Sequence, residues 1–203
     1  MTTTENRTRP ANGGGVLRKK VTDAIIEAAL AEVAKTGYAR TSMDAVARRA
    51  GVGKATLYRR WPSKQTMLAE LIRDKVTEAL PPMPATSALS TDLRELLVTL
   101  RDQLSHPLVT RIGTGLLAEA THDATLDDLL QNEVAAPRRA AAHAILQNAI
   151  TRGELPPNLN MEMGIDLLIA PLAFRMLMLK SPIDDQYIET LTRSIEAALK
   201  ASS

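Results

Sequence analysis

The stretch of sequence that decides the fold is residues 41–60, which reads TSMDAVARRAGVGKATLYRR. A hydroxyl side chain at its start, apolar residues at helical spacing and a closing glycine predict a short helix up to residue 50. The turn Gly51-Val52-Gly53 follows, and residues 54–60 are predicted to form a second short helix with Leu57 as its inward anchor. Two short helices joined by a three-residue turn predict a helix-turn-helix.

The flanking sequence completes a small domain around this motif. Apolar residues at three- and four-residue steps predict a helix over about 18–36, closed by Gly37. A further helix is expected over about 63–80. The helix-turn-helix domain is therefore assigned to residues 18–65, and residues 1–17, rich in Thr, Asn, Arg and Gly, are expected to form a flexible basic arm.

Residues 66–203 are expected to form a second, larger helical domain, which includes a Pro-, Ser- and Thr-rich linker at about 81–91. Apolar periodicity predicts its helices at about 92–104, 107–120, 125–152, 160–180 and from 184 onward, with a kink or break at Pro137. No strand-like alternation of useful length occurs, and the apolar residues are mainly Ala, Leu, Ile, Val and Met. The predicted fold class is all-α with about nine helices.

Composition excludes several classes of protein. The 203 residues are 45% apolar and 24% charged, which is ordinary for a folded globular chain. The sequence contains no cysteine, which rules out disulfides, thiolate catalysis and sulfur-ligated metal sites. No uncharged apolar run approaches the ~20 residues that span a bilayer, and the first residues lack the apolar segment of a secretory signal. We expect a cytoplasmic protein with no membrane partner.

Charge is distributed unevenly along the chain. Residues 1–65 contain 13 Lys and Arg against 5 Asp and Glu, a net charge of +8, whereas residues 66–203 contain 12 against 18, a net charge of −6. A basic N-terminal third indicates that this end of the protein meets a polyanion.

Nine residues in and around the helix-turn-helix have the chemistry to bind duplex DNA. Lysine and arginine bind guanine edges or phosphates, threonine contacts a thymine methyl group or a phosphate, the tyrosine hydroxyl bonds a phosphate, and a small alanine permits close approach. Hydroxyl and lysine side chains at helix N-termini lie where a phosphate is favoured. The candidates are Thr41, Ser42, Lys54, Ala55, Thr56, Tyr58, Arg59, Arg60 and Lys64. Each one alone is equally explained as a cap, a surface charge or a packing residue, but the set together indicates DNA binding.

A longer pattern over about residues 18–70 resembles the DNA-binding domain of the TetR/AcrR family of bacterial transcriptional regulators. It reads Gly37-Tyr38-x-x-Thr41-Ser42-x-x-x-Val46-Ala47-x-x-Ala50-Gly51-Val52-x-Lys54-x-Thr56-Leu57-Tyr58-x-x-Trp61-Pro62-Ser63-Lys64-x-x-Met67-Leu68. The resemblance implies that the same nine residues contact operator DNA. Gly53 departs from the family pattern, which usually has a helix-capping serine or aspartate there, so the recognition helix has a weaker start. The motif Ala170-Pro171-Leu172-x-Phe174-Arg175 is similar to the C-terminal domain of an actinobacterial-type subgroup.

The resemblance also implies that the second domain binds a small molecule and forms a homodimer. The predicted helix 160–180 is apolar on too many sides to face only its own domain, which favours a dimer interface shared with the last helix. The residues expected there are Leu168, Leu172, Phe174, Met178, Ile188, Leu191 and Ile195. The alternative is that they belong to an ordinary core.

Composition offers little about a ligand site. Helices between 92 and 180 are rich in Leu, Ile, Met and Ala, which indicates an apolar, adaptable pocket, although their methionines are better explained as core or interface residues. His122-Asp123 and Asp127-Asp128 suggest a metal or acid–base site only weakly, and a solvated helix start explains them better. No metal, cofactor or catalytic residue is expected.

Three functions remain for comparison with the structure. The first is a ligand-responsive repressor that binds a palindromic operator as a homodimer and is released by a small apolar effector, with the helix 63–80 carrying the signal. The second is a helical enzyme using histidine and a carboxylate, although the sequence lacks a nucleophile motif, a phosphate loop and a metal signature. The third is a helical scaffold protein with a vestigial helix-turn-helix.

Overall fold

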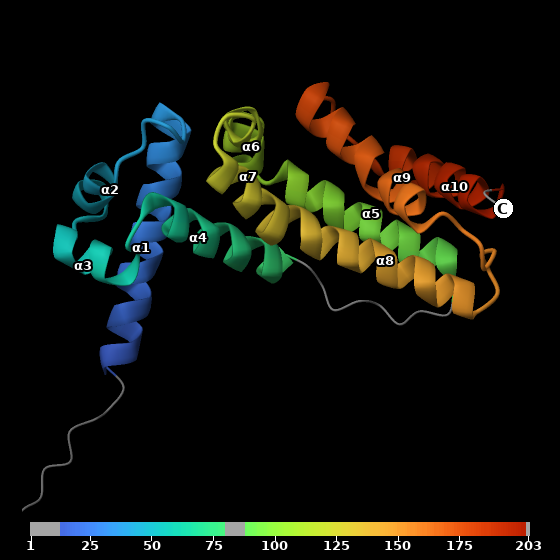
Figure 1. The fold of residues 1–203 in the computed structure, drawn as a ribbon, viewed down its shortest axis with the longest axis horizontal. Coiled ribbons are helices and arrows are strands. Elements are labelled where there is room, and N and C mark those ends of the chain that lie inside the picture. The colour runs from blue at the N-terminus through green and yellow to red at the C-terminus, as the bar shows by residue number, and fades with distance from the viewer. Residues whose placement is uncertain (1–12, 80–87, 202–203) are drawn as a thin grey trace, which may run out of the picture.

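The computed structural model describes residues 13–79 and 88–201, and this part of the chain is all-helical, as predicted (Figure 1). Ten α-helices and two π-helical segments are present there, and because each π-segment continues a neighbouring helix they form nine continuous helical segments. The elements are α1 (Gly13–Thr36), α2 (Met43–Ala50), α3 (Lys54–Arg60), α4 (Lys64–Ala79), α5 (Leu89–Ser105), α6 (Pro107–Ala120), α7 (Ala124–Leu130), η1 (Gln131–Ala135), α8 (Ala136–Thr151), α9 (Met161–Ala173), η2 (Phe174–Met178) and α10 (Asp185–Ala201).

Two predicted boundaries differ from the structure. Helix α1 begins at Gly13, five residues before the predicted start, so residues 13–17 belong to the helix and not to an arm. Helix α5 begins at Leu89, inside the predicted linker. The rest of the predicted arm and residues 81–87 of the linker lie outside the described residues.

The N-terminal helices pack around one apolar cluster. Its fully buried members include Ile25 of α1, Val46 of α2 and Leu57 of α3. The same cluster contains Leu116 of α6 and Leu126 of α7, both buried. The helix-turn-helix is therefore continuous in its packing with the first helices of the second domain.

The second cluster is organised along α5. Its buried leucines, which include Leu93, Leu97 and Leu100, contact α8, α9 and α10. In Figure 1, α5 and α8 run side by side, and α9 and α10 lie at the opposite end of the molecule from α2 and α3. Both α9 and α10 pack against α5, and α9 also packs against α8. Among the described helices none is both long enough and apolar enough to cross a membrane.

Four of the residues predicted for the dimer interface lie in this core instead. Leu168, Leu172 and Ile188 are 0% exposed and Ile195 is 3% exposed. For these four the core alternative applies, because α9 packs against α5 and α8, α10 packs against α5, and these side chains lie on the buried faces of the two helices. Of the other residues in that prediction, Leu191 packs partly buried against the core, while Phe174 and Met178 are exposed.

Both prolines inside predicted helices lie beside π-helical segments. Of the kink or break expected at Pro137, the break does not occur; the helix is irregular there because η1 widens it just before Pro137, which lies in the first turn of α8. Pro171 lies within α9, and η2 follows three residues later. A π-segment accommodates the altered hydrogen bonding without ending the helix.

Gly164 provides a test of the close packing between α8, α9 and α10. A Cβ atom there would lie 2.9 Å from Leu146 Cδ1 and 3.4 Å from Leu199 Cδ2. We expect Gly164→Val to lower the free energy of unfolding by about 1–3 kcal/mol through overpacking. The matched Gly115→Val, in a helix with nothing within 4 Å of the new Cβ, should change it by less than about 0.5 kcal/mol. Urea denaturation measures both, and equal effects would contradict this account of α9.

Candidate nucleic-acid interface

The turn between α2 and α3 follows directly from its capping residues. Ser42 is the N-cap of α2, and its Oγ accepts a hydrogen bond from the Ala45 N–H at 3.1 Å. Gly51 ends α2 in the left-handed conformation, with φ of 67°. The Val52 N–H then returns to the Ala47 carbonyl at 3.0 Å, which reverses the chain before α3. The predicted pair of helices and its three-residue turn are confirmed.

Helix α3 is anchored on one side and open on the other. Leu57 and Trp61 are 0% and 1% exposed and attach the helix to the N-terminal cluster. Gly53 is the N-cap and makes no side-chain bond, which confirms the expected weak start. The residues of α3 that are exposed are Lys54, Ala55, Tyr58, Arg59 and Arg60, while Thr56 is partly buried. Figure 1 places this helix at the end of the molecule far from α9 and α10.

The cations of α3 differ in how they are held. Arg59 makes no ion pair or hydrogen bond through its side chain within residues 13–79 and 88–201. Lys54 forms an ion pair with Asp44 of α2. Arg60 donates to Glu70 Oε1 at 2.7 Å and also to the Thr22 hydroxyl, with its guanidinium 4.5 Å from the centre of the Trp61 ring. Arg60 therefore ties α3 to α1 and α4.

Two candidate contacts from the sequence are engaged inside the domain. The side chain of Thr41 is buried, and its hydroxyl donates to the Gly37 carbonyl at 2.7 Å. Lys64 Nζ donates to the Tyr38 carbonyl at 2.7 Å and lies 4.0 Å from the centre of the Tyr38 ring. Burial lowers the pKa of Lys64. Both residues hold the turn between α1 and α2, a role that their spacing did not reveal.

The sequence analysis missed Arg48. This arginine lies exposed in the last turn of α2, and its side chain forms no bond with any other described residue. Its neighbour Arg49 is paired with Glu32 of α1 at 3.0 Å. The helical spacing of Val46 and Ala47 on the buried face would have identified position 48 as outward-facing.

The turn that precedes α2 also contacts the second domain. The Ala39 N–H donates to Glu119 Oε1 of α6 at 3.2 Å. Tyr38 lies buried beside it, and burial together with the nearby carboxylates of Asp123 and Glu119 raises the pKa of Tyr38 to about 12. Helix α6 is thus in direct polar and apolar contact with the helix-turn-helix domain.

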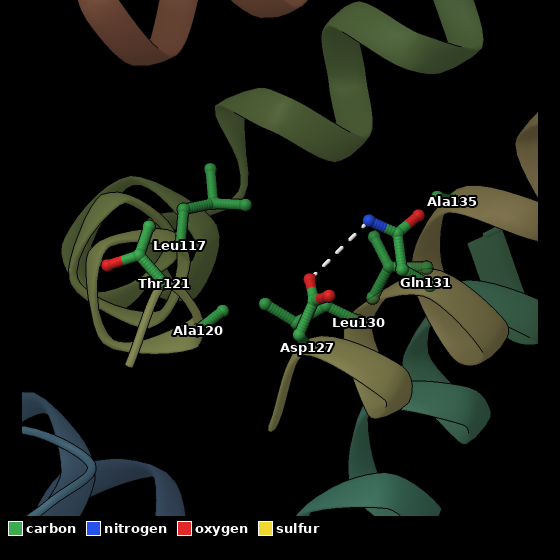
Figure 2. A pocket seen from close by; sticks show the side chains of 8 residues that line it. Leu117, Ala120, Thr121, Asp127, Leu130, Gln131 and Ala135 are labelled. Carbon is green, nitrogen blue, oxygen red and sulfur yellow. Dashed lines mark hydrogen bonds between the residues drawn. The ribbon is translucent and has the colours of Figure 1, made fainter. Parts of the chain in front are cut away.

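A pocket of about 460 Å³ lies on helices α6 and α7 and segment η1 (Figure 2). In Figure 2, Leu117 and Ala120 lie across it from Asp127, Leu130 and Gln131, and Gln131 Nε2 donates to Asp127 Oδ1 at 3.5 Å. Its lining is Leu117, Ala120, Thr121, Asp127, Leu130, Gln131, Val134 and Ala135, which includes none of the methionines. Met161 and Met176 pack against the core instead, as the preferred interpretation predicted.

The acidic and histidine residues of this region form no metal site. Asp123 is the N-cap of α7, where its Oδ1 accepts the Leu126 N–H at 3.1 Å, so the helix-start interpretation is confirmed for it. No group of three or more His, Asp or Glu side chains placed to hold a metal occurs among the residues that the structure describes.

Comparison with known proteins identifies both parts of the chain. Residues 25–71 match the family described as bacterial regulatory proteins, tetR family, and residues 83–195 match the tetracyclin repressor-like C-terminal domain. The chain belongs to the TetR family. It is therefore a DNA-binding transcriptional regulator with a helix-turn-helix, and the enzyme alternative is rejected because members of this family are transcription factors.

Individual TetR-family proteins resemble the chain over nearly its whole length. The regulator YdeS of Bacillus subtilis is 31% identical over 184 residues, which cover 89% of this chain and 90% of YdeS. The DNA-binding transcriptional repressor TetR of Mycobacteroides abscessus is 30% identical over 172 residues, covering 85% and 90%. The solved structure of the flavonoid-responsive regulator FrrA has the same fold, with a TM-score of 0.72 and 24% identity over 91% of this chain and 100% of FrrA.

Glu70 of α4 tests how α3 is positioned. One of its oxygens accepts from the indole Nε1 of Trp61 at 2.7 Å and the other from Arg60. We expect Glu70→Ala to lower the free energy of unfolding by about 1–3 kcal/mol, because a buried indole N–H loses its partner. Glu27→Ala, at an exposed carboxylate of α1, is the control. If chemical denaturation gave the same value for both variants, the Glu70 contact would not be holding Trp61.

Proposed function

We propose that two copies of the chain bind a palindromic operator, each placing α3 in the major groove. The observation that carries this proposal is the two-sided character of α3, with Leu57 and Trp61 buried while Ala55, Tyr58 and Arg59 face outward. An arginine and a tyrosine beside a small alanine suit base edges and the adjacent phosphates.

The other candidates are of two kinds: residues that contact DNA and residues that hold α2 and α3 in position. Lys54 and Thr56 lie in the first turn of α3, and Ser42 and Arg48 lie at the two ends of α2, where they reach phosphates beside the groove. Thr41, Arg60 and Lys64 act by fixing the positions of α2 and α3: Thr41 is buried, Lys64 is partly buried over the Tyr38 ring, and Arg60 bridges α1 and α4. DNA binding is therefore assigned to six of the nine sequence candidates, with Arg48 added.

Replacement of Arg59 tests the DNA interface. The guanidinium of Arg59 has no partner among the described residues, so its removal should not disturb the fold. We expect Arg59→Ala to weaken operator binding about tenfold and to reduce the slope of log K against log salt concentration by about one per subunit. Arg193→Ala removes an exposed arginine from α10 and should leave both unchanged. The measurement is fluorescence anisotropy on a duplex selected from genomic fragments by the purified protein. Equal losses in the two variants would contradict the assignment.

The dimer is proposed to form through the α9 stripe, which we define as Met163, Ala170, Phe174 and Met178. Along α9 and η2 these residues are separated in turn by seven, four and four positions, and all four are exposed. Three of them are large apolar side chains that are 56–66% exposed. They lie away from the buried Leu168 and Leu172, so α9 and η2 present one face to the core and another to a second copy. Such pairing would hold two α3 helices at the ~34 Å spacing of successive major-groove sites.

A charge placed in the α9 stripe tests the dimer. We expect Phe174→Glu to raise the dimer dissociation constant about a hundredfold, because an unpaired carboxylate would be buried at a cost on the order of 3 kcal/mol. Gln147→Glu, at an exposed position of α8, should leave it unchanged. Sedimentation velocity at micromolar concentration measures the change. A wild-type chain that sediments as a monomer would contradict the proposal.

We further propose that the protein is a cytoplasmic repressor released by a small apolar effector. The pocket is built on α6 and α7, and the same helices contribute Leu116 and Leu126 to the N-terminal cluster. An effector that moves them would displace the turn at Ala39 and, through α4, both recognition helices; a coupling of roughly 1–3 kcal/mol is sufficient. The names of the mycobacterial repressor and of the flavonoid-responsive FrrA support repression and ligand response.

A further inference from the structure

Arg138 of α8 is a cation held inside the second domain by neutral groups. Its side chain is partly buried between η1, α8 and α5. Its Nε donates to Gln103 Oε1 at 3.2 Å, and its Nη1 donates to the Val134 carbonyl at 2.8 Å. It forms no bond to a carboxylate within the part of the chain that the structure describes.

Three other arginines with partly covered side chains are paired with carboxylates. Arg101 and Arg152 have side chains that are 19% and 26% exposed, and each pairs with two carboxylates. Arg139, directly after Arg138, bonds Asp166 at 2.9 Å and also Glu162. Two partly buried arginines lack a carboxylate partner among the described residues: Arg175, which bonds the Pro182 carbonyl and covers the Tyr187 ring, and Arg138.

The surroundings of Arg138 make its charge costly. Burial lowers the pKa of Arg138, and no neighbouring carboxylate opposes this effect. Its partner Gln103 is itself 8% exposed on the leucine-rich buried face of α5. An arginine stays ionised in such a place, and a charge removed from water without an opposite charge destabilises the fold. A cation kept under these conditions has a function that an uncharged residue would not perform.

The guanidinium keeps donors for a ligand. A guanidinium has five N–H groups; Nε and Nη1 each use one, which leaves three. A carboxylate or sulfonate accepts two such donors in parallel. Val134 and Ala135, one turn earlier on the same continuous helix, line the pocket, so apolar surface and unneutralised charge occur on adjoining turns.

We propose that Arg138 binds the anionic group of the effector, which is an apolar molecule carrying one carboxylate or sulfonate. This inference rests on the proposed ligand response and specifies its chemistry. The anion supplies a counter-charge that no described carboxylate provides, and the apolar body lies in the pocket against Leu117, Leu130 and Val134. Binding draws α5, η1 and α8 together at the segment that contacts α4.

Two dyes that differ by one anionic group test the proposal on the full chain. They are 8-anilinonaphthalene-1-sulfonate and its uncharged analogue N-phenyl-1-naphthylamine, titrated by fluorescence. We expect Arg138→Gln to weaken sulfonate binding at least tenfold and to change binding of the neutral dye less than twofold. Arg138→Lys should lose less sulfonate affinity than Arg138→Gln. Arg139→Gln is the matched control and should leave both dyes within twofold, because its charge is already paired.

Each result decides the proposal. It is overturned if wild-type protein does not bind the sulfonate, if Arg138→Gln binds it as wild type does, or if both dyes weaken equally. A cooperative urea transition like that of wild type shows that each variant is folded. Fluorescence anisotropy of the selected duplex separates this inference from the proposed function. If the wild-type protein does not bind the duplex, the proposed function itself is contradicted. Duplex release by the sulfonate dye in wild type and Arg139→Gln, but not in Arg138→Gln, supports the effector role, and release from none of them overturns it.

Discussion

The indole of Trp61 sets the position of the recognition helix. Its ring is buried against the N-terminal cluster, its N–H is held by Glu70 of α4, and the guanidinium of Arg60 covers its face. A helix of seven residues has little intrinsic stability in water, so α3 depends on these contacts and on Leu57 for its existence as well as its direction. The exposed residues Ala55, Tyr58 and Arg59 can serve recognition only because the buried residues Leu57 and Trp61 fix the position of the helix.

The division into a DNA-binding part and a regulatory part is less sharp in packing than along the chain. Leu116 and Leu126 come from the second domain but are buried with the helix-turn-helix residues. The polar contact between Ala39 and Glu119 lies at the same junction. A movement of α6 therefore changes the packing of the first domain directly, without requiring that α4 alone carry the signal.

Sequence reasoning succeeded where a local rule applies. Gly51, Ser42 and the apolar spacing around Val46 predict the helix-turn-helix because turn and cap chemistry depends on near neighbours. The sequence did not show that Thr41, Lys64 and Arg60 bond within the domain. The partners of Lys64 and Arg60 are distant in sequence, and the bond from Thr41 to the Gly37 carbonyl depends on the conformation of the turn between α1 and α2. The same limit applies to the dimer residues: composition shows that the helix 160–180 has two apolar faces, but only the packing of α5 shows that Leu168 belongs to the inner one. The isolation of Arg138 is also a tertiary property, since nothing near it in sequence distinguishes it from Arg139.

The ion pair between Lys54 and Asp44 bears on selectivity for DNA. A phosphate that approaches this lysine competes with a carboxylate already in place, so exchanging one anion for the other yields a small net attraction. A polyanion that contacts only Lys54 therefore gains little binding free energy. In the complex that we propose, a cognate groove would gain more, because Tyr58 and Arg59 would engage it at the same time, and the carboxylate of Asp44 would thereby reduce binding to non-cognate DNA.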